Sequence, residues 1–353
     1  MTSKSATPIR VAVLGATGYG GIELLRWLSG HPAVEVVAVS SESSAGKPLA
    51  ALYPHLADCP LTLLPAAEAR FAGDPQVVFC ATPNGEAMRL APKILQRGAA
   101  VIDLSADFRL TDVRVHSEVY QMAHTAADLL PQAVYGLPEL YRERVRQARL
   151  IANPGCFPTS VLLALAPLLR AGVIDARGII IDSKSGVSGV GRTALQTSNH
   201  FPEANEDVCA YKVGTHRHTP EIEQQLTTEG AGEMVVTFTP HLIPMTRGIF
   251  STCYATLRRE CTTADVLRVY HTMYAASPFV TVLDEQTLPH TKWCYGSNRA
   301  FLTARVDART GRVITLSAID NLGKGMAGQA VQNMNILCGL PEELGLNAPA
   351  IYP

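Results

Sequence analysis

An excess of charge of one sign is absent from this chain of 353 residues. Thirty Lys and Arg stand against thirty-one Asp and Glu, which leaves a formal net charge of −1. Binding to nucleic acid or to a charged membrane surface usually needs such an excess, so we expect neither partner. Apolar runs stay below the ~18 residues that cross a membrane, and no signal-peptide pattern opens the chain. These absences favour a cytoplasmic protein.

Cysteines at metal-binding or disulfide spacing are lacking as well. None of the eight cysteines forms a C-x-x-C pair, and they are too sparse for a disulfide scaffold. His216 and His218 lie close together in the sequence, but no cysteine stands near them at a zinc-finger spacing. We therefore expect no metal site.

Up to about residue 150 the sequence alternates short apolar runs with helical patterns, which is typical of βαβ units. After residue 150 the predicted strands are longer, and their side chains alternate between two faces. A Thr-Gly turn between the predicted strands 300–307 and 312–320 predicts a hairpin. We expect an α/β protein with a Rossmann-type, doubly wound parallel sheet and a second α+β domain with a mixed or antiparallel sheet. The predicted strands of the first domain are 9–14, 34–39, 76–81, 101–104 and 149–153, and its predicted helices include 21–28 and 86–96.

A glycine-rich turn follows the first predicted strand, beginning at Gly15 with the spacing G-x-x-G-x-x-G. Glycines let the backbone approach a pyrophosphate, whose charge the N-terminus of the next helix stabilises. A tight turn without a ligand is the alternative, but the strand before and the helix after favour dinucleotide binding. After the second strand, Ser40 and Ser41 leave room for a 2′-phosphate and favour NADP over NAD, although Glu42 follows them.

Cys156 stands in the string NPGCFPT, between a short apolar strand and a predicted helix over 159–170. A helix N-terminus stabilises a thiolate through its dipole and its unpaired N–H groups, so this thiol could be a nucleophile. A thiolate nucleophile needs a proton-transfer partner, and the polar loop 213–221 offers both His216 and His218. On the residues alone, a small apolar cysteine and a solvated loop are the open alternatives.

Two further stretches combine small or hydroxyl residues with cations, as anion-binding loops do. Residues 183–192 follow a predicted strand and contain Lys184 and Arg192. Residues 105–109 end with Arg109 at the sheet edge where ligands of open α/β sheets bind. A flexible loop and a structural Asp–Arg pair are the respective alternatives.

The strings GATGYGG, SADFRL, NPGCFPTS, SGVSGVGR, HRHTPEI and DNLGKGMAGQAVQNMN resemble, in this order, the N-acetyl-gamma-glutamyl-phosphate reductases of arginine biosynthesis. The wider relatives are aspartate-semialdehyde and glyceraldehyde-3-phosphate dehydrogenases. The resemblance implies NADPH-dependent reduction of an acyl phosphate through a cysteine thioester, with release of inorganic phosphate, by a homodimer or homotetramer. It also implies a Rossmann domain of residues 1–155 and 324–353, with an inserted catalytic and oligomerisation domain of residues 156–323.

The resemblance also assigns roles to single residues. Cys156 matches the nucleophile, and His218 is favoured as the acid and base, with His216 in reserve. The cofactor contacts that it implies are Gly15, Thr17, Gly18, Tyr19, Gly20, Gly21, Ser40, Ser41, Thr82, Pro83, Ser188, Gly189 and Asn321. The substrate contacts that it implies are Arg109, Asn153, Ser185, Arg192, Arg217 and Glu221.

Three alternative functions stay open at this point. The same chemistry could act on aspartyl phosphate or on a carrier-bound aminoadipyl phosphate, since pocket shape decides the substrate. A non-catalytic NADP-binding redox regulator could keep the fold. A cysteine hydrolase could use Cys156 and a histidine, but it would leave the glycine turn without a role.

Overall fold

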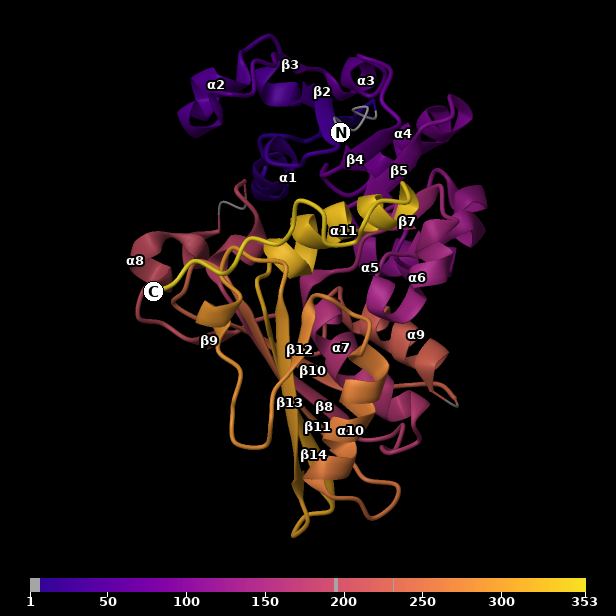
Figure 1. Ribbon diagram of the computed structural model, residues 1–353, viewed down its shortest axis with the longest axis vertical. Helices are drawn as coiled ribbons and strands as arrows, with labels where there is room; N and C mark the ends of the chain where they lie inside the picture. Colours follow the sequence, from indigo (N-terminus) through magenta and orange to yellow (C-terminus); the bar gives the residue numbers. More distant parts are fainter. Residues whose placement is uncertain (1–6, 194–195, 231) are drawn as a thin grey trace, which may run out of the picture. The chain divides into compact units, whose positions relative to one another are not determined.

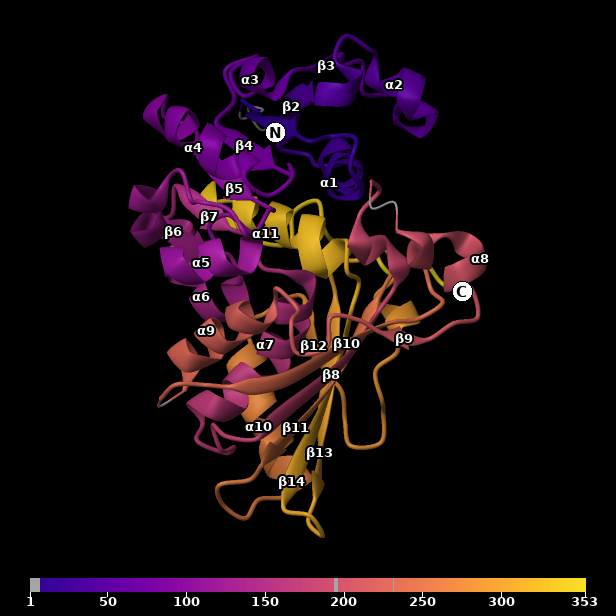
Figure 2. The same ribbon diagram turned by 180° about the vertical axis from the view of Figure 1, so that it is seen from behind.

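The computed structural model describes residues 7–193, 196–230 and 232–353. The chain forms two compact units (Figures 1 and 2). The first unit comprises the residues up to Asn153 and Ala327–Asn347; the second comprises Pro154–Met326 and Ala348–Pro353.

The resemblance implies domain boundaries after residues 155 and 323. In the structure the corresponding boundaries lie after Asn153 and Met326. The largest difference is at the C-terminus, where the expectation places residues 348–353 in the first unit. In the structure these residues belong to the second unit. A backbone hydrogen bond of 2.9 Å, from Ile351 N to Tyr295 O, helps to hold them there.

The first unit contains a seven-stranded sheet, in which every strand pair is parallel and the order is β3-β2-β1-β4-β5-β7-β6. This confirms the predicted Rossmann-type sheet. Strands β4 and β5 are buried along their whole length, which is typical of parallel strands covered on both faces. The strands are β1 (Ile9–Leu14), β2 (Val34–Ser40), β3 (Leu63–Leu64), β4 (Val77–Cys80), β5 (Ala100–Asp103), β6 (Ala133–Tyr135) and β7 (Leu150–Ala152).

The helices of the first unit include one from the far end of the chain, α11, which is yellow in Figure 1. It packs beside α1 and α6. Asn335 on α11 shares a 3.0 Å hydrogen bond with His31, and Gln332 donates one of 3.0 Å to Glu139. The helices are α1 (Tyr19–Ser29), α2 (Leu49–Leu52), α3 (Ala66–Ala69), α4 (Glu86–Gln96), α5 (Val113–Tyr120), α6 (Pro138–Arg146) and α11 (Gly328–Leu337).

The second unit contains a mixed seven-stranded sheet with the order β12-β13-β14-β11-β8-β10-β9. Its β13–β14 hairpin is the predicted one, and β8 pairs antiparallel with β11 and parallel with β10. This confirms the predicted mixed sheet. The strands are β8 (Ile179–Ser185), β9 (Cys209–Ala210), β10 (Val236–Leu242), β11 (Ile249–Thr256), β12 (Val280–Val282), β13 (Ala300–Asp307) and β14 (Arg312–Ile319).

Helices lie along one side of this second sheet, as Figures 1 and 2 show for α7, α9 and α10. In β8, β10 and β11, every second residue is therefore buried beneath helices while the residues between them stay partly exposed. None of the helices in the described ranges has the length and hydropathy that crossing a membrane requires. The helices are α7 (Cys156–Arg170), α8 (Phe201–Ala204), α9 (Thr219–Glu229) and α10 (Thr263–Tyr274).

Candidate active site

The glycine-rich turn between β1 and α1 is closed so tightly that Gly15 and Gly21 have no room for side chains. Gly15 has a φ of +79°, and a methyl group on its Cα would lie 2.3 Å from the Ala81 carbonyl oxygen. A methyl group on Gly21 would lie 2.3 Å from the Gly15 carbonyl oxygen. Gly18 is less crowded, since a methyl group on its Cα would lie 3.6 Å from the nearest atom, the Gly15 carbonyl oxygen. Gly15 and Gly21 thus let the start of α1 lie close against the carboxyl edge of the sheet.

Ser40 and Ser41 hold this turn in place. The Gly15 amide donates a hydrogen bond of 3.0 Å to Ser40 Oγ, and Thr17 Oγ1 and Ser41 Oγ are 3.0 Å apart. The serines are only 1% and 5% exposed. The structure therefore gives both hydroxyls a scaffolding role that the sequence did not predict. Thr82 lies directly against the turn, because its backbone nitrogen would be 3.2 Å from a methyl group on Gly15.

Arg109 and Asn153, two of the expected substrate contacts, lie together at the ends of β5 and β7. Arg109 is 9% exposed and donates from Nε to the Asn153 carbonyl oxygen at 2.8 Å and from Nη2 to the Leu104 carbonyl oxygen at 2.9 Å. Asn153 is fully buried, and its Oδ1 accepts a hydrogen bond of 3.1 Å from Asn333. These bonds fix the backbone just before the segment that carries Cys156.

Cys156 is the first residue of α7 and is half-buried. Sequence reasoning starts this helix at Thr159, but the extended Gly155 (φ −65°, ψ 152°) lets it begin at Cys156, and Pro158 fits the first turn. A methyl group on Gly155 would lie 2.6 Å from His218 Nε2, and one on Gly325 would lie 2.9 Å from Cys156 Cβ. The residue before Cys156, the candidate nucleophile, and the His218 ring are thus in direct contact.

His216 is placed differently from His218. Its Nδ1 accepts a 3.1 Å hydrogen bond from the His218 backbone amide, so it shapes the loop that carries His218. Its ring meets Phe157, Tyr211 and Phe238 edge-on at centroid distances of 5.6, 5.5 and 5.4 Å. Burial, and then the positive charges of Lys212 and Arg217, lower the pKa of His216 to about 4. With a pKa this low, the His216 ring is neutral at neutral pH.

Glu221, on the first turn of α9, is fully buried beside the segment that carries Cys156. Its Oε1 accepts a 2.8 Å hydrogen bond from the Gly155 amide, across 66 residues of sequence. The carboxylate thus holds the residue before Cys156 in its extended conformation, a role that its place in the sequence did not suggest. Arg217 and Arg192, two further expected substrate contacts, are exposed in the second unit.

The loop after β8 and the segment after β14 come together in the second unit. Asn321 donates from Nδ2 to Ser188 Oγ at 2.9 Å, and its Oδ1 accepts a 2.8 Å bond from the Gly248 amide. A methyl group on Gly189 would lie 3.1 Å from Ser185 Oγ. These expected site residues are therefore neighbours. Lys184, which the sequence suggests as part of an anion-binding loop, instead forms a 3.0 Å ion pair with Asp182 within β8.

One buried ion pair in this region was missed by sequence reasoning. Asp320 is fully buried, and its Oδ2 lies 3.0 Å from Arg247 Nε. Its Oδ1 also accepts the amides of Leu322 and Gly323, each at 2.8 Å. The pair fixes the segment that carries Asn321 and leads to Gly325. The only sequence signal is the position of Asp320 directly before Asn321.

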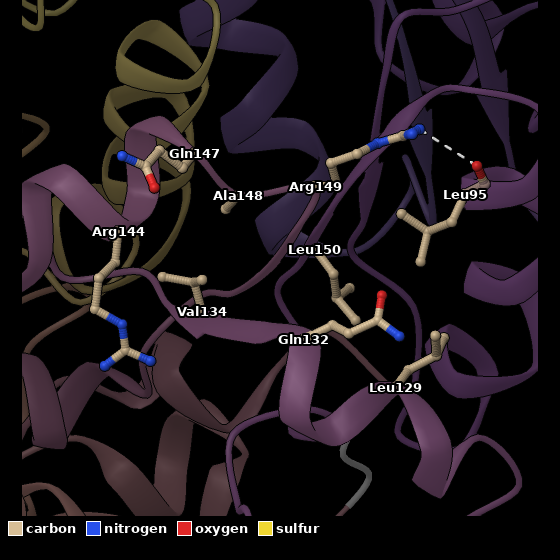
Figure 3. A pocket seen from close by; sticks show the side chains of 9 residues that line it. All are labelled: Leu95, Leu129, Gln132, Val134, Arg144, Gln147, Ala148, Arg149 and Leu150. Atoms are coloured by element: carbon tan, nitrogen blue, oxygen red, sulfur yellow. Dashed lines mark hydrogen bonds between the residues drawn. The ribbon is translucent and has the colours of Figure 1, made fainter.

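A cavity of about 510 Å³ lies elsewhere in the first unit (Figure 3). Val134 in β6 and Leu150, the first residue of β7, line it together with Arg144, Gln147 and Arg149. Arg149 Nη2 donates to the Leu95 carbonyl oxygen at 3.3 Å. None of the expected site residues lines this cavity. It lies at the amino ends of the parallel strands, whereas ligands of such sheets bind at the carboxyl ends.

Comparison with known proteins identifies the class to which this fold and site belong. Residues 10–148 match the semialdehyde dehydrogenase NAD binding domain, and residues 156–321 match the semialdehyde dehydrogenase dimerisation domain. Among solved structures, aspartate semialdehyde dehydrogenase II from Vibrio cholerae, complexed with ASA, has a TM-score of 0.73 at 17% identity, covering 95% of this chain and 99% of that one. Aspartate semialdehyde dehydrogenase with NADP from Candida albicans has a TM-score of 0.63 at 16% identity, covering 94% and 98%. The chain has the semialdehyde dehydrogenase fold.

Curated relatives define the family more narrowly. N-acetyl-gamma-glutamyl-phosphate reductase from Symbiobacterium thermophilum is 53% identical over 98% of this chain and 99% of the relative. The reductase of the same name from Moorella thermoacetica is 51% identical over 98% of this chain and 100% of the relative. The chain belongs to the N-acetyl-gamma-glutamyl-phosphate reductase family, as the motifs predict.

Proposed function

We propose that this protein reduces N-acetyl-gamma-glutamyl phosphate to N-acetylglutamate 5-semialdehyde and inorganic phosphate with NADPH, in arginine biosynthesis. The observation that carries this proposal is the contact of His218 with Gly155, directly before a half-buried Cys156 at the start of α7. About half of the residues are shared with reductases of this name over nearly the full length. All eight cysteines are free, which suits the reducing conditions of the cytoplasm.

The first unit fits a dinucleotide at the turn between β1 and α1. Gly15 and Gly21 leave no room for side chains there, so the amides at the start of α1 can approach a pyrophosphate. Tyr19, at 40% exposure, and Thr82 and Pro83 after β4 would flank the cofactor. Ser188, Gly189 and Asn321 are the further cofactor contacts that the family resemblance implies. NADP(H), when bound, supplies the hydride for reduction and accepts it in the reverse direction.

The chemistry begins at Cys156. His218 takes the thiol proton, and the Cys156 sulfur attacks the acyl carbon. The bond from carbon to the phosphate oxygen breaks, inorganic phosphate leaves, and a thioester on Cys156 remains. Amides at the start of α7 stabilise the tetrahedral oxyanion. After reduction, His218 donates its proton to the thiohemiacetal oxygen and takes it back as the carbon–sulfur bond breaks and the aldehyde forms.

The other residues around Cys156 hold this arrangement or bind the substrate. We assign Glu221 and His216 to positioning, because the first binds the Gly155 amide and the second binds the His218 amide. Cations and polar side chains can bind the carboxylate and phosphate groups of the substrate. These expected substrate contacts are Arg109, Asn153, Ser185, Arg192 and Arg217.

The substrate assignment is tested by the reverse reaction. We expect phosphate-dependent reduction of NADP⁺ with N-acetylglutamate 5-semialdehyde, at a kcat/KM at least about 100-fold above that with aspartate semialdehyde, because an unfilled acetyl pocket weakens transition-state binding. Absorbance at 340 nm follows the turnover. Activity with aspartate semialdehyde alone would contradict the proposed substrate. No phosphate-dependent turnover with either aldehyde would favour a non-catalytic NADP-binding protein.

We further propose a homodimer or homotetramer assembled through the face of the second sheet opposite α7, α9 and α10, which no helix of the described residues covers. This face carries partly exposed apolar side chains, and the chain matches a dimerisation domain over 156–321. A second copy of the sheet would bury them. They include Ile180, Phe250, Tyr254, Phe301, Ile314 and Leu316.

Ile180→Asp tests this interface, because Ile180 is 37% exposed on the uncovered face. We expect the mass from light scattering to fall from that of the oligomer toward the monomer mass of 37.9 kDa, since a buried unpaired carboxylate opposes association. Leu52→Asp is the matched control, since Leu52 is 36% exposed on α2 in the first unit. An unchanged mass for Ile180→Asp would exclude this face.

A further inference from the structure

The groups at the end of β2 and directly after it already form hydrogen bonds within the protein. Ser40 and Ser41 are almost fully buried and bind the glycine turn. The Glu42 carboxylate accepts a 2.8 Å hydrogen bond from the Ala66 amide at the start of α3. In dinucleotide-binding sheets, this end of β2 is where the adenosine ribose is recognised. A 2′-phosphate placed there would meet a carboxylate, so its positive partner has to come from another segment.

Three arginines of the first unit lie on or directly after α3 and α4. Arg70 follows α3 directly, and Arg97 follows α4; both guanidinium groups lie over the Phe71 ring, at 4.7 and 4.1 Å from its centroid. Arg89, on the second turn of α4, forms an ion pair with Glu86. Buried Arg70 Nε has no hydrogen-bond partner among the described residues.

The position of α3 links these cations to the end of β2. Ala66 is bonded to Glu42, and Arg70 follows four residues later, which is about 6 Å along a helix. Arg89 also feels the charge of Glu42, which helps its partner Glu86 to raise the pKa of Arg89. Burial, followed by the charges of Arg89 and Arg97, lowers the pKa of Arg70. The part of this lowering that comes from Arg89 and Arg97 reflects repulsion between neighbouring guanidinium groups.

We propose that Arg70 and Arg89 bind the 2′-phosphate of the cofactor and so set the preference for NADP over NAD. The inference rests on the proposed function. A phosphate dianion would balance the repulsion between the guanidinium groups and supply acceptors for their N–H groups. The ion pair between Arg89 and Glu86 does not prevent Arg89 from binding a phosphate. The Arg89 side chain is 62% exposed, and an exposed ion pair contributes little to stability. Arg70 is held in place by its stacking on Phe71.

The test compares two fragments of the cofactor on the full-length protein. 2′,5′-ADP carries the 2′-phosphate and 5′-AMP lacks it, so calorimetric titration of both isolates the contribution of that group. We expect Arg89→Ala to weaken 2′,5′-ADP binding about tenfold, and Arg70→Ala/Arg89→Ala to weaken it about a hundredfold, since a charge-assisted hydrogen bond contributes about a factor of ten. The 5′-AMP affinity should change less than about twofold.

Lys93→Ala is the matched control, because Lys93 is an exposed cation on the same helix, α4. It should leave both affinities unchanged, and thermal melting of each variant checks the fold. Equal weakening of both fragments, or an unchanged 2′,5′-ADP affinity in Arg89→Ala, would overturn the inference while leaving the proposed reduction intact. A wild-type protein that binds both fragments equally would overturn the inference and the NADP assignment together.

Discussion

Cys156→Ser is expected to reduce turnover by at least about a thousandfold. A serine hydroxyl is far less nucleophilic than a thiolate, and it forms an ester where the proposed route needs a thioester. NADPH binding should survive, because the glycine turn that we assign to the pyrophosphate belongs to the first unit. Stopped-time assays give the loss of activity, and the fluorescence of bound NADPH gives the affinity.

Trapping the acylated protein makes this result specific. Incubating the wild type with the acyl phosphate and no dinucleotide should add the mass of one acyl group at Cys156, whereas Cys156→Ser should gain none. Cys209→Ser is a suitable control, since Cys209 is also half-buried in the second unit but lies on β9 and not at a helix start. Wild-type activity in Cys156→Ser, or an adduct on another residue, would rule out the proposed nucleophile.

His218→Asn is expected to lower kcat by about 10² to 10⁴, the range typical for loss of a general acid and base. His216→Asn should have a much smaller effect on kcat. With its pKa lowered to about 4, His216 does not supply an imidazolium near neutral pH. Its Nδ1 accepts the His218 amide, and an asparagine amide oxygen can replace that acceptor.

The pH dependence of kcat/KM distinguishes the two histidines further. If His218 transfers the proton, its replacement should remove one limb of the profile, whereas His216→Asn should keep both limbs with a lower plateau. His216→Ala serves as the comparison that lacks the acceptor for the His218 amide. A larger loss of kcat in His216→Asn than in His218→Asn would reverse the assignment of the acid and base.

Much of the fold could be predicted because its signals are local. The predicted bounds of β1 and α4 agree with the structure, since an apolar run and a 3.6-residue period each lie within a few residues. The helix α10 was not predicted, although Thr262 and Asp265 form a capping box at its start. The start of α7 was placed three residues late, because the extended Gly155 and the helical Cys156 give no periodic signal.

The sequence by itself determined the family, the glycine turn and the place of Cys156 between a strand and a helix, because each is written in a contiguous string. Only the tertiary structure decided what the surrounding groups contact. It brings Glu221 to the Gly155 amide and the His218 ring onto Gly155, and it directs Ser40 into the glycine turn. These partners are far apart along the chain. Their pairing depends on how the helices and strands pack, which no local pattern of residues encodes.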